Sequence, residues 1–99
     1  MHYLLFYEKA PDFEDRQKPL SVAHRDYLQT FATRGDLILG GSLENPTDGS
    51  AVLLFKADSA AAVEAVAQGD PYVKGGIVIK WSVRPWDLVI GSGLNAVKL

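Results

Sequence analysis

Two residues far apart in the sequence, His24 and Asp70, are the pair best suited to do chemistry together. A carboxylate beside an imidazole orients the ring and fixes its tautomer, so the pair can act as a general base and acid. His24 is one of two histidines and lies in a predicted helix where an apolar residue would be expected. Asp70 lies in the segment GDPYV (residues 69–73), between the second predicted helix and the last predicted strand. The function of the chain depends on whether the fold brings these two side chains together.

The position of His24 on its predicted helix leaves two interpretations open. With Leu20 at zero on a helical wheel, Phe31 lies at about 20°, His24 at about 40° and Leu28 at about 80°. His24 is therefore in the middle of the apolar arc. A buried neutral imidazole needs a hydrogen-bond partner, and the structural alternative is a core histidine bonded to a backbone carbonyl. The functional alternative is an imidazole that lines a pocket between helix and sheet, where it can exchange protons near neutral pH.

Asp70 also has two interpretations, and they are compatible. Asp followed by Pro is a favourable helix start, which predicts that Asp70 caps a short turn beginning at Pro71. The functional alternative is that the Asp70 carboxylate accepts a hydrogen bond from His24 and fixes its tautomer. A capping carboxylate that also faces a cavity can do both.

Five further residues are candidates for binding a small substrate. Ser42 follows a glycine pair in a predicted strand, and its hydroxyl is expected to face the same cavity. No G-x-S-x-G motif surrounds it, so the sequence does not favour a serine nucleophile. The other candidates are aromatic residues that could line a pocket, although such residues more often belong to a core or an interface; they are Tyr7, Tyr27, Tyr72 and Trp86.

Composition excludes several classes of function. The 99 residues are 47% hydrophobic and 22% charged, as in an ordinary globular domain with one core. A net charge of −2 with no basic patch argues against nucleic-acid partners, and no apolar run is long enough to span a membrane. Without cysteines, a metal-ligand constellation or a nucleotide motif, no cofactor is expected. The first residues lack the pattern of a secretion signal, so we expect a cytoplasmic protein.

The hydrophobic pattern predicts an α+β fold in the order β-α-β-β-α-β. Strands are expected over residues 2–8, 36–43, 51–56 and 76–86, and helices over 19–34 and 60–68. Pro19 and Ser59 suit helix starts, and Gly35 and Gly69 suit helix ends. Right-handed crossovers then place both helices on one face of a four-stranded antiparallel sheet, a ferredoxin-like arrangement. Alternation along the last strand predicts that one face holds Ile77, Ile79, Trp81 and Val83.

The sheet face without helices predicts a homodimer. The expected central strands, YLLFY (residues 3–7) and AVLLF (51–55), are apolar on both faces, and the helices can cover only one. A large apolar patch in water usually marks an interface, so we expect two sheets to pack face to face. The alternative cover is the apolar tail, residues 88–99, which could pack on its own sheet or on the partner. The chain thus divides into a domain over residues 1–87 and this tail.

Several of these segments together resemble the YciI-like (YCII-related) proteins. The resemblance rests on MHYLLFYEKAPDF (residues 1–13), the helix with His24, GDLILGGSLENP (35–46), DPYV (70–73) and WSVRPW (81–86). It implies a dimeric α+β barrel of ferredoxin-like type, a homodimer, and an active site centred on a histidine and an aspartate, here His24 and Asp70. One related enzyme type eliminates chloride from a chlorinated hydroxyhydroquinone, and other related domains are binding or accessory modules. The chain has Ser42 where related sequences often have proline, and its tail is longer than the domain requires.

Three hypotheses follow. The first is a small cofactor-free lyase or isomerase, in which His24 transfers a proton on a small metabolite and Asp70 orients the ring. The second is a non-catalytic dimeric module that binds a small molecule in the same cavity. The third is a structural domain with a closed core, which predicts no cavity beside His24.

Overall fold

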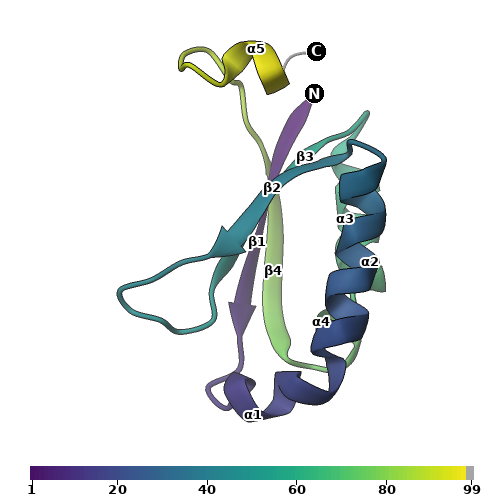
Figure 1. Cartoon of the computed structure of the whole chain (residues 1–99), viewed down its shortest axis with the longest axis vertical. Coiled ribbons are helices and arrows are strands. Elements are labelled where there is room, and N and C mark those ends of the chain that lie inside the picture. Colours follow the sequence, from purple (N-terminus) through teal and green to yellow (C-terminus); the bar gives the residue numbers. More distant parts are fainter. Residues whose placement is uncertain (98–99) are drawn as a thin grey trace.

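Four antiparallel strands form one sheet in the order β2-β3-β1-β4, with the longer helices on one face (Figure 1). The computed structural model describes residues 1–97. The strands are β1 (His2–Lys9), β2 (Leu37–Ser42), β3 (Ala51–Lys56) and β4 (Val78–Pro85). The helices are α1 (Phe13–Gln17), the 3-10 turn η1 (Lys18–Leu20), α2 (Ser21–Thr33), α3 (Ala60–Gly69), α4 (Pro71–Lys74) and α5 (Leu94–Val97). The predicted order β-α-β-β-α-β and the placement of both main helices are confirmed.

Local signals set most of the element ends. The hydroxyl of Ser59 accepts a hydrogen bond from the backbone of Ala62 and caps α3. Gly35 ends the α2 region with a φ of 85°, a backbone conformation that glycine adopts without strain. The helix expected over residues 19–34 begins later, because Pro19 belongs to η1 and α2 starts at Ser21.

The core lies between the sheet and the helices. In β1 the buried residues are Tyr3, Leu5 and Tyr7, which alternate with half-buried ones. Their partners in β3 continue the same face, since Tyr3 pairs with Phe55 and Leu5 with Leu53. From the helix side, α3 contributes Val63, Val66 and Ala67. This covered face holds most of the core, as the period-two pattern of a half-buried strand requires.

The alternation predicted for the last strand breaks at Ile79. The register between β1 and β4 shifts beside Glu8 and Lys9, so an extra residue interrupts the ladder of β4. Val78 is buried, whereas Ile79 is 63% exposed. Trp81 resumes packing against the core. The expectation that Ile79 shares one face with Ile77, Trp81 and Val83 was wrong, because a bulge reverses the direction of the side chains on one side of it.

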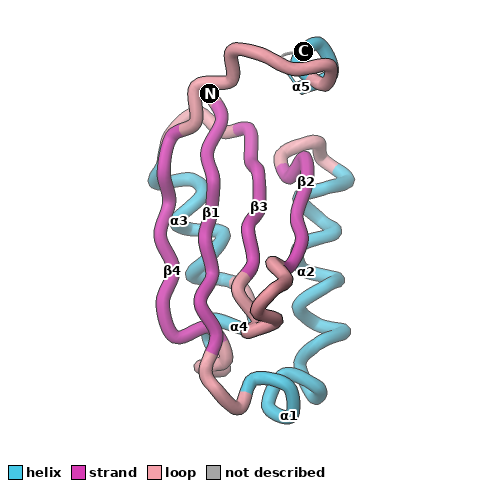
Figure 2. The backbone as a smooth tube through the Cα atoms, turned by 90° about the vertical axis from the view of Figure 1, so that its left-hand side faces the viewer, coloured by secondary structure: helices cyan, strands magenta, loops and turns pink. Residues whose placement is uncertain are grey.

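The opposite face of the sheet is apolar and has no helix over its centre. Leu4 pairs with Leu54 and Phe6 with Val52, and these four side chains point away from α2 and α3. Figure 2 views the molecule from this side and shows the tail lying at one end of the strands. A cavity of about 490 Å³ separates this face from the tail, which contributes Leu88 and Leu94 among other residues.

The tail covers only part of the open face. The backbone N–H of Trp86 donates a hydrogen bond to the carbonyl of His2 and so fixes where the tail leaves the sheet. Beyond it, Val89 is 69% exposed and Ile90 is 90% exposed. The last two residues of the predicted tail, 98 and 99, lie outside the described residues. Among the helices within residues 1–97, none has the length and apolar character needed to cross a membrane.

One close approach in the core predicts a destabilising substitution. The hydroxyl of Tyr27 donates a hydrogen bond to the carbonyl of Val66 at 2.8 Å and lies directly over Gly69. A Cβ added at Gly69 would overlap the Tyr27 hydroxyl. We expect Gly69→Ala to lower the free energy of unfolding by about 1–3 kcal/mol, despite the better helix propensity of alanine. Urea unfolding measures this change.

The matched control is Gly41→Ala, because a Cβ at Gly41 meets no atom within 4 Å. Equal stability losses in the two variants would contradict the overlap at Gly69. Adding Tyr27→Phe should relieve part of the cost of Gly69→Ala, since the overlapping oxygen is then gone.

Candidate active site

The fold brings His24 and Asp70 into direct contact. Nδ1 of His24, in the first turns of α2, lies 2.7 Å from Oδ1 of Asp70. Asp70 lies at the junction of two helices, where α3 ends and α4 begins. The core-histidine alternative, with a backbone carbonyl as the partner of His24, is therefore not what the structure shows. The two residues have the geometry of an imidazole oriented by a carboxylate.

Asp70 is fully buried, and both of its oxygens accept hydrogen bonds. The hydroxyl of Tyr7 donates to Oδ2 at 2.8 Å, and the backbone N–H of Tyr72 donates to Oδ1 at 2.9 Å. The Tyr72 contact is the helix cap that the sequence predicted, so Asp70 caps α4 and contacts His24 at once. Three donors surround one carboxylate, which is the arrangement that an ionised, acceptor-only group requires.

The contact with Asp70 determines which nitrogen of His24 is free. An ionised carboxylate can only accept a hydrogen bond, so Nδ1 of His24 carries the proton. The lone pair is then on Nε2, which has no hydrogen-bond partner among residues 1–97 and is not buried. The ring of Tyr72 stacks on the imidazole with centroids 3.7 Å apart and planes 7° from parallel. Asp70 and Tyr72 together hold the ring, and the lone pair of Nε2 is free to accept a proton.

Burial changes the acidity of the groups around Asp70. It raises the pKa of Tyr7 well above the ordinary value for tyrosine, and the charge of Asp70 raises it further. Burial also raises the pKa of Tyr72, with a smaller contribution from Asp70. Both phenols therefore stay protonated at neutral pH, and the Tyr7 hydroxyl serves as a donor to Asp70.

His24 opens onto a cavity of about 410 Å³ between α2 and strands β1, β2 and β3. Tyr7 and Ser42 also line it; both pair with Ala51 across the sheet and so lie in one row on the helix side. Its apolar walls are Leu28, Leu37, Ala51 and Leu53. This volume suits a small organic molecule. The closed-core hypothesis, which required no cavity beside His24, does not describe this structure.

Two of the predicted site residues lie elsewhere. Tyr27 packs edge-on against Phe31 and bonds the carbonyl of Val66, and it does not line the His24 cavity. Trp86 lines the cavity under the tail, on the other face of the sheet. Tyr72 belongs to the site as the ring stacked on His24. The structure thus gathers Tyr7, His24, Ser42, Asp70 and Tyr72 and leaves Tyr27 and Trp86 outside.

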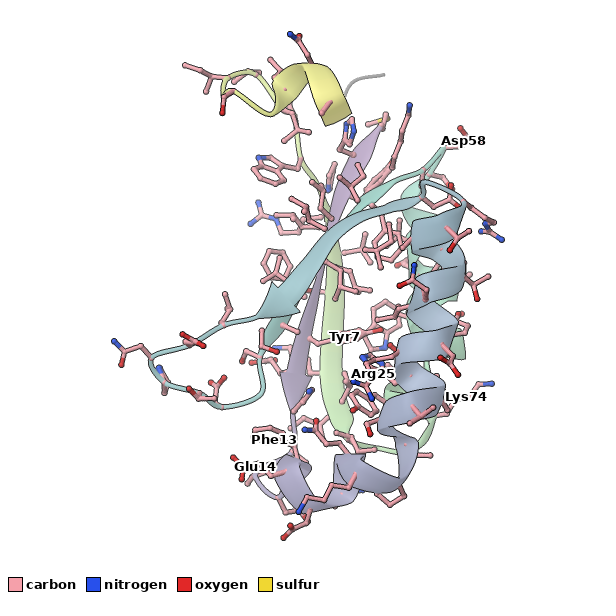
Figure 3. All side chains as sticks on the ribbon, viewed as in Figure 1. Tyr7, Phe13, Glu14, Arg25, Asp58 and Lys74 are labelled. Carbon is pink, nitrogen blue, oxygen red and sulfur yellow. The ribbon has the colours of Figure 1, made fainter. Side chains whose placement is uncertain are left out.

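Sequence reasoning missed two residues of the cavity, Lys9 and Arg25. Lys9 ends β1 on the same face as Tyr7, so the period-two pattern could have identified it. Arg25 follows His24 and points away from the apolar arc on an ideal wheel, but its long side chain reaches back to the cavity. Figure 3 shows Arg25 on the inner side of α2, in the same region as Tyr7.

The described residues offer no site for a metal ion. Within residues 1–97, no group of three or more histidine, aspartate or glutamate side chains is arranged to hold one. What the arrangement can do is transfer a proton at Nε2 of His24 to or from a molecule in the cavity.

Comparisons with known proteins agree with this architecture. The model of the YCII-related domain matches residues 1–87, as the resemblance in the sequence predicted. Among solved structures, 5-chloro-2-hydroxyhydroquinone dehydrochlorinase (TftG) from Burkholderia phenoliruptrix AC1100, in complex with 2,5-dihydroxybenzoquinone, is similar with a TM-score of 0.75. It is 20% identical, and the match covers 88% of this chain and 94% of that chain.

A second solved structure, an antibiotic biosynthesis monooxygenase, is similar with a TM-score of 0.56. It is 14% identical, over 90% of this chain and 98% of that one. At these identities the likenesses show the fold alone, and they confirm the predicted ferredoxin-like α+β architecture. No protein of curated function matches the chain.

The hydrogen bond from Tyr7 predicts a pH-dependent stability. Above about pH 10 the unfolded chain loses the Tyr7 proton, whereas the folded chain keeps it because its pKa is raised. The unfolded state then binds fewer protons than the folded state. The contribution of Tyr7 to the free energy of unfolding therefore falls by about 1.4 kcal/mol per pH unit. The contribution is fully present below about pH 10. We expect this alkaline slope to become shallower in Tyr7→Phe.

The same variant leaves Oδ2 of Asp70 without its donor and should cost about 1–3 kcal/mol at neutral pH. Urea unfolding from neutral to alkaline pH measures both effects. The matched control at neutral pH is Tyr3→Phe, in the same strand and face, whose hydroxyl contacts only the sulfur of Met1 at 3.7 Å. Parallel alkaline slopes for the wild type and Tyr7→Phe would contradict the buried phenol–carboxylate contact.

Proposed function

The chain belongs to the YCII-related domain family, and we propose that it is a small cofactor-free enzyme of lyase or isomerase type acting on a small metabolite. The observation that supports this proposal is the contact of 2.7 Å between His24 and Asp70 at the wall of a cavity. His24 is the general base and acid, and Asp70 is the positioning residue. We expect the enzyme to act in the cytoplasm, the location that its sequence predicts.

The reaction begins when Nε2 of His24 removes a proton from a carbon or hydroxyl group of the bound molecule. The imidazole becomes an imidazolium, which the neighbouring Asp70 carboxylate stabilises without taking the proton itself. In an elimination, the electron pair left by the proton forms a double bond and a leaving group departs with its own pair. In an isomerisation, the imidazolium returns the proton to a different atom of the same molecule. Neither route requires a nucleophile on the protein.

The similar solved structure supports the choice of reaction class. TftG is named as a dehydrochlorinase, an enzyme that eliminates hydrogen chloride, and its structure contains 2,5-dihydroxybenzoquinone. The present cavity of about 410 Å³ can hold a single ring of that size. We therefore propose a small ring compound with an acidic proton as the substrate, with Ser42 and the edge of Tyr7 on the cavity wall.

The first test is a comparison of activity in wild type and His24→Gln. We expect a panel of small phenolic compounds, beginning with 5-chloro-2-hydroxyhydroquinone and measured by chloride release, to contain a substrate. Because Nε2 is the proton acceptor, His24→Gln should lower kcat/KM by about 10²–10⁴-fold. Asp70→Asn should give a similar loss, since it removes the group that fixes the tautomer.

His2→Gln provides the control, because His2 lies at the start of β1 and outside the His24 cavity. A reaction whose rate survives His24→Gln would contradict the acid–base role. Ligand binding without turnover, unchanged in His24→Gln, would instead identify a binding module.

We also propose that two copies pack through the open faces of their sheets. The support is the apolar row formed by Leu4, Phe6, Val52 and Leu54, which faces away from α2 and α3 and is only partly covered by the tail. Leu39, beside this row on the edge strand β2, is 67% exposed. Contiguous apolar surface of this kind is usually buried in an interface.

Sedimentation at micromolar concentration should therefore give the mass of a dimer. Phe6→Lys places a charge at the centre of the open face and should shift the equilibrium to monomer, because an unpaired charge is costly to bury. The control is Val22→Lys on the outer surface of α2, where the side chain is 61% exposed. A wild-type monomer would contradict this proposal.

A further inference from the structure

The cavity beside His24 holds two cationic side chains and no acidic one. Lys9 from the end of β1 and Arg25 from α2 both line it. In the view of Figure 3, Arg25 lies on the sheet side of α2, and the residue is exposed, as expected at the rim of a cavity. The chain as a whole has a net charge of −2, so this local excess of cations is not a general property of its surface.

Lys9 is not neutralised by an acid. Its Nζ donates a hydrogen bond to the amide oxygen of Gln17 at 2.9 Å and lies 4.9 Å from the centre of the Tyr72 ring. Neither partner has a formal charge. Burial lowers the pKa of Lys9, while the charge of Asp70 acts in the opposite direction. The ammonium group is thus partly desolvated and has no ion-pair partner among residues 1–97.

Arg25 has no hydrogen bond or ion pair within the part of the chain that the structure describes. By contrast, Arg16 pairs with Asp12, and Arg34 pairs with Asp36 at 2.8 Å. Arg25 lines the same cavity as His24, the ring that stacks on Tyr72. A guanidinium at the rim of a cavity with its donors free is suited to bind an oxygen anion.

Charge balance leads to one class of ligand. Asp70 carries one negative charge beneath the cavity, while Lys9 and Arg25 carry two positive charges at its wall. One positive charge is left without compensation. We infer that the His24 cavity selects a small, largely apolar molecule with a single anionic oxygen, a carboxylate or a phenolate, which Lys9 and Arg25 bind.

This inference names the substrate class of the site proposed above and rests on that proposal for its role in turnover. Removal of a proton by Nε2 leaves negative charge on the substrate. Lys9 and Arg25 line the cavity from β1 and from α2, and both can stabilise that charge as it develops. A neutral molecule would leave the one excess positive charge uncompensated.

Binding of simple probes tests the inference without turnover. Benzoate and 4-nitrophenolate are the two anions, and benzamide is the neutral analogue of benzoate. In NMR titrations of the full chain, both anions should perturb backbone signals around the cavity. Benzamide should bind with an affinity at least tenfold lower than that of benzoate. We expect Arg25→Gln and Lys9→Gln each to lower the affinity for benzoate by about tenfold. This factor corresponds to the loss of ~1.4 kcal/mol of charge-assisted hydrogen bonding. Neither should change the affinity for benzamide. The stronger of the two anions identifies whether carboxylate or phenolate is preferred.

Arg34→Gln is the matched control, since Arg34 is an arginine at the far end of α2 and is already paired with Asp36. Equal affinity for benzoate and benzamide, unchanged benzoate affinity in both cation variants, or no binding of either anion at millimolar concentration would each overturn the inference. His24→Gln separates the two proposals. If anions bind selectively but the reaction rate does not change in His24→Gln, only the proposed catalysis is refuted. If turnover depends on His24 but neutral ligands bind more tightly than anions, only this inference is refuted.

Discussion

A carboxylate buried away from water is stable only when enough donors replace the water it has lost, and the site is organised around that requirement at Asp70. Three elements meet this demand: β1 supplies the hydroxyl of Tyr7, α2 supplies the ring nitrogen of His24, and α4 supplies the backbone N–H of Tyr72. The same three contacts join the sheet to two helices. Structural and chemical roles therefore coincide, because each group that stabilises Asp70 also fixes the geometry of the cavity wall.

The chemistry follows from how the imidazole is held. Asp70 contacts the Nδ1 side of the ring and Tyr72 covers one of its faces, so Nε2 is the ring nitrogen that can meet a ligand. The cavity in front of it is apolar at its walls and cationic at two positions, Lys9 and Arg25. We propose that this base, the cavity in front of it and the two cations together form a site for proton removal that produces an anion. The open face of the sheet is separate from this site, since β1 points its two sets of side chains to opposite sides.

The sequence predicted the elements well because their signals are local. Ser59, Gly35 and the Asp70–Pro71 pair set helix ends by hydrogen bonds and backbone preferences within a few residues. The pairing of His24 with Asp70 could be proposed because one lies on the apolar face of its helix and the other in a tight turn. Their contact depends on how two helices pack on the sheet, which local patterns do not determine.

The features that the sequence did not predict depend on how distant segments of the chain pair and pack in three dimensions. The donor role of Tyr7 requires that β1 bring its hydroxyl to Asp70, a contact between residues 63 positions apart. The bulge beside Lys9 breaks the alternation of β4 and exposes Ile79, and nothing in a period-two pattern signals it. Trp86 was grouped with the other aromatic residues by type, but it lies on the opposite face of the sheet. Arg25 reaches the cavity through the length of its side chain, which a helical wheel ignores.

The tautomer of His24 tests the central claim most directly, because the lone pair on Nε2 follows from the contact with Asp70. Long-range ¹H–¹⁵N NMR spectra of the imidazole side chains, recorded above the usual titration range of histidine, distinguish the two tautomers. His24→Gln and His2→Gln assign the two sets of signals. The account predicts that neutral His24 carries its proton on Nδ1 in the wild type and that this preference is lost in Asp70→Asn. A proton on Nε2 in the wild type would contradict the account, since the nitrogen facing the cavity would then be a donor with no lone pair to accept a proton.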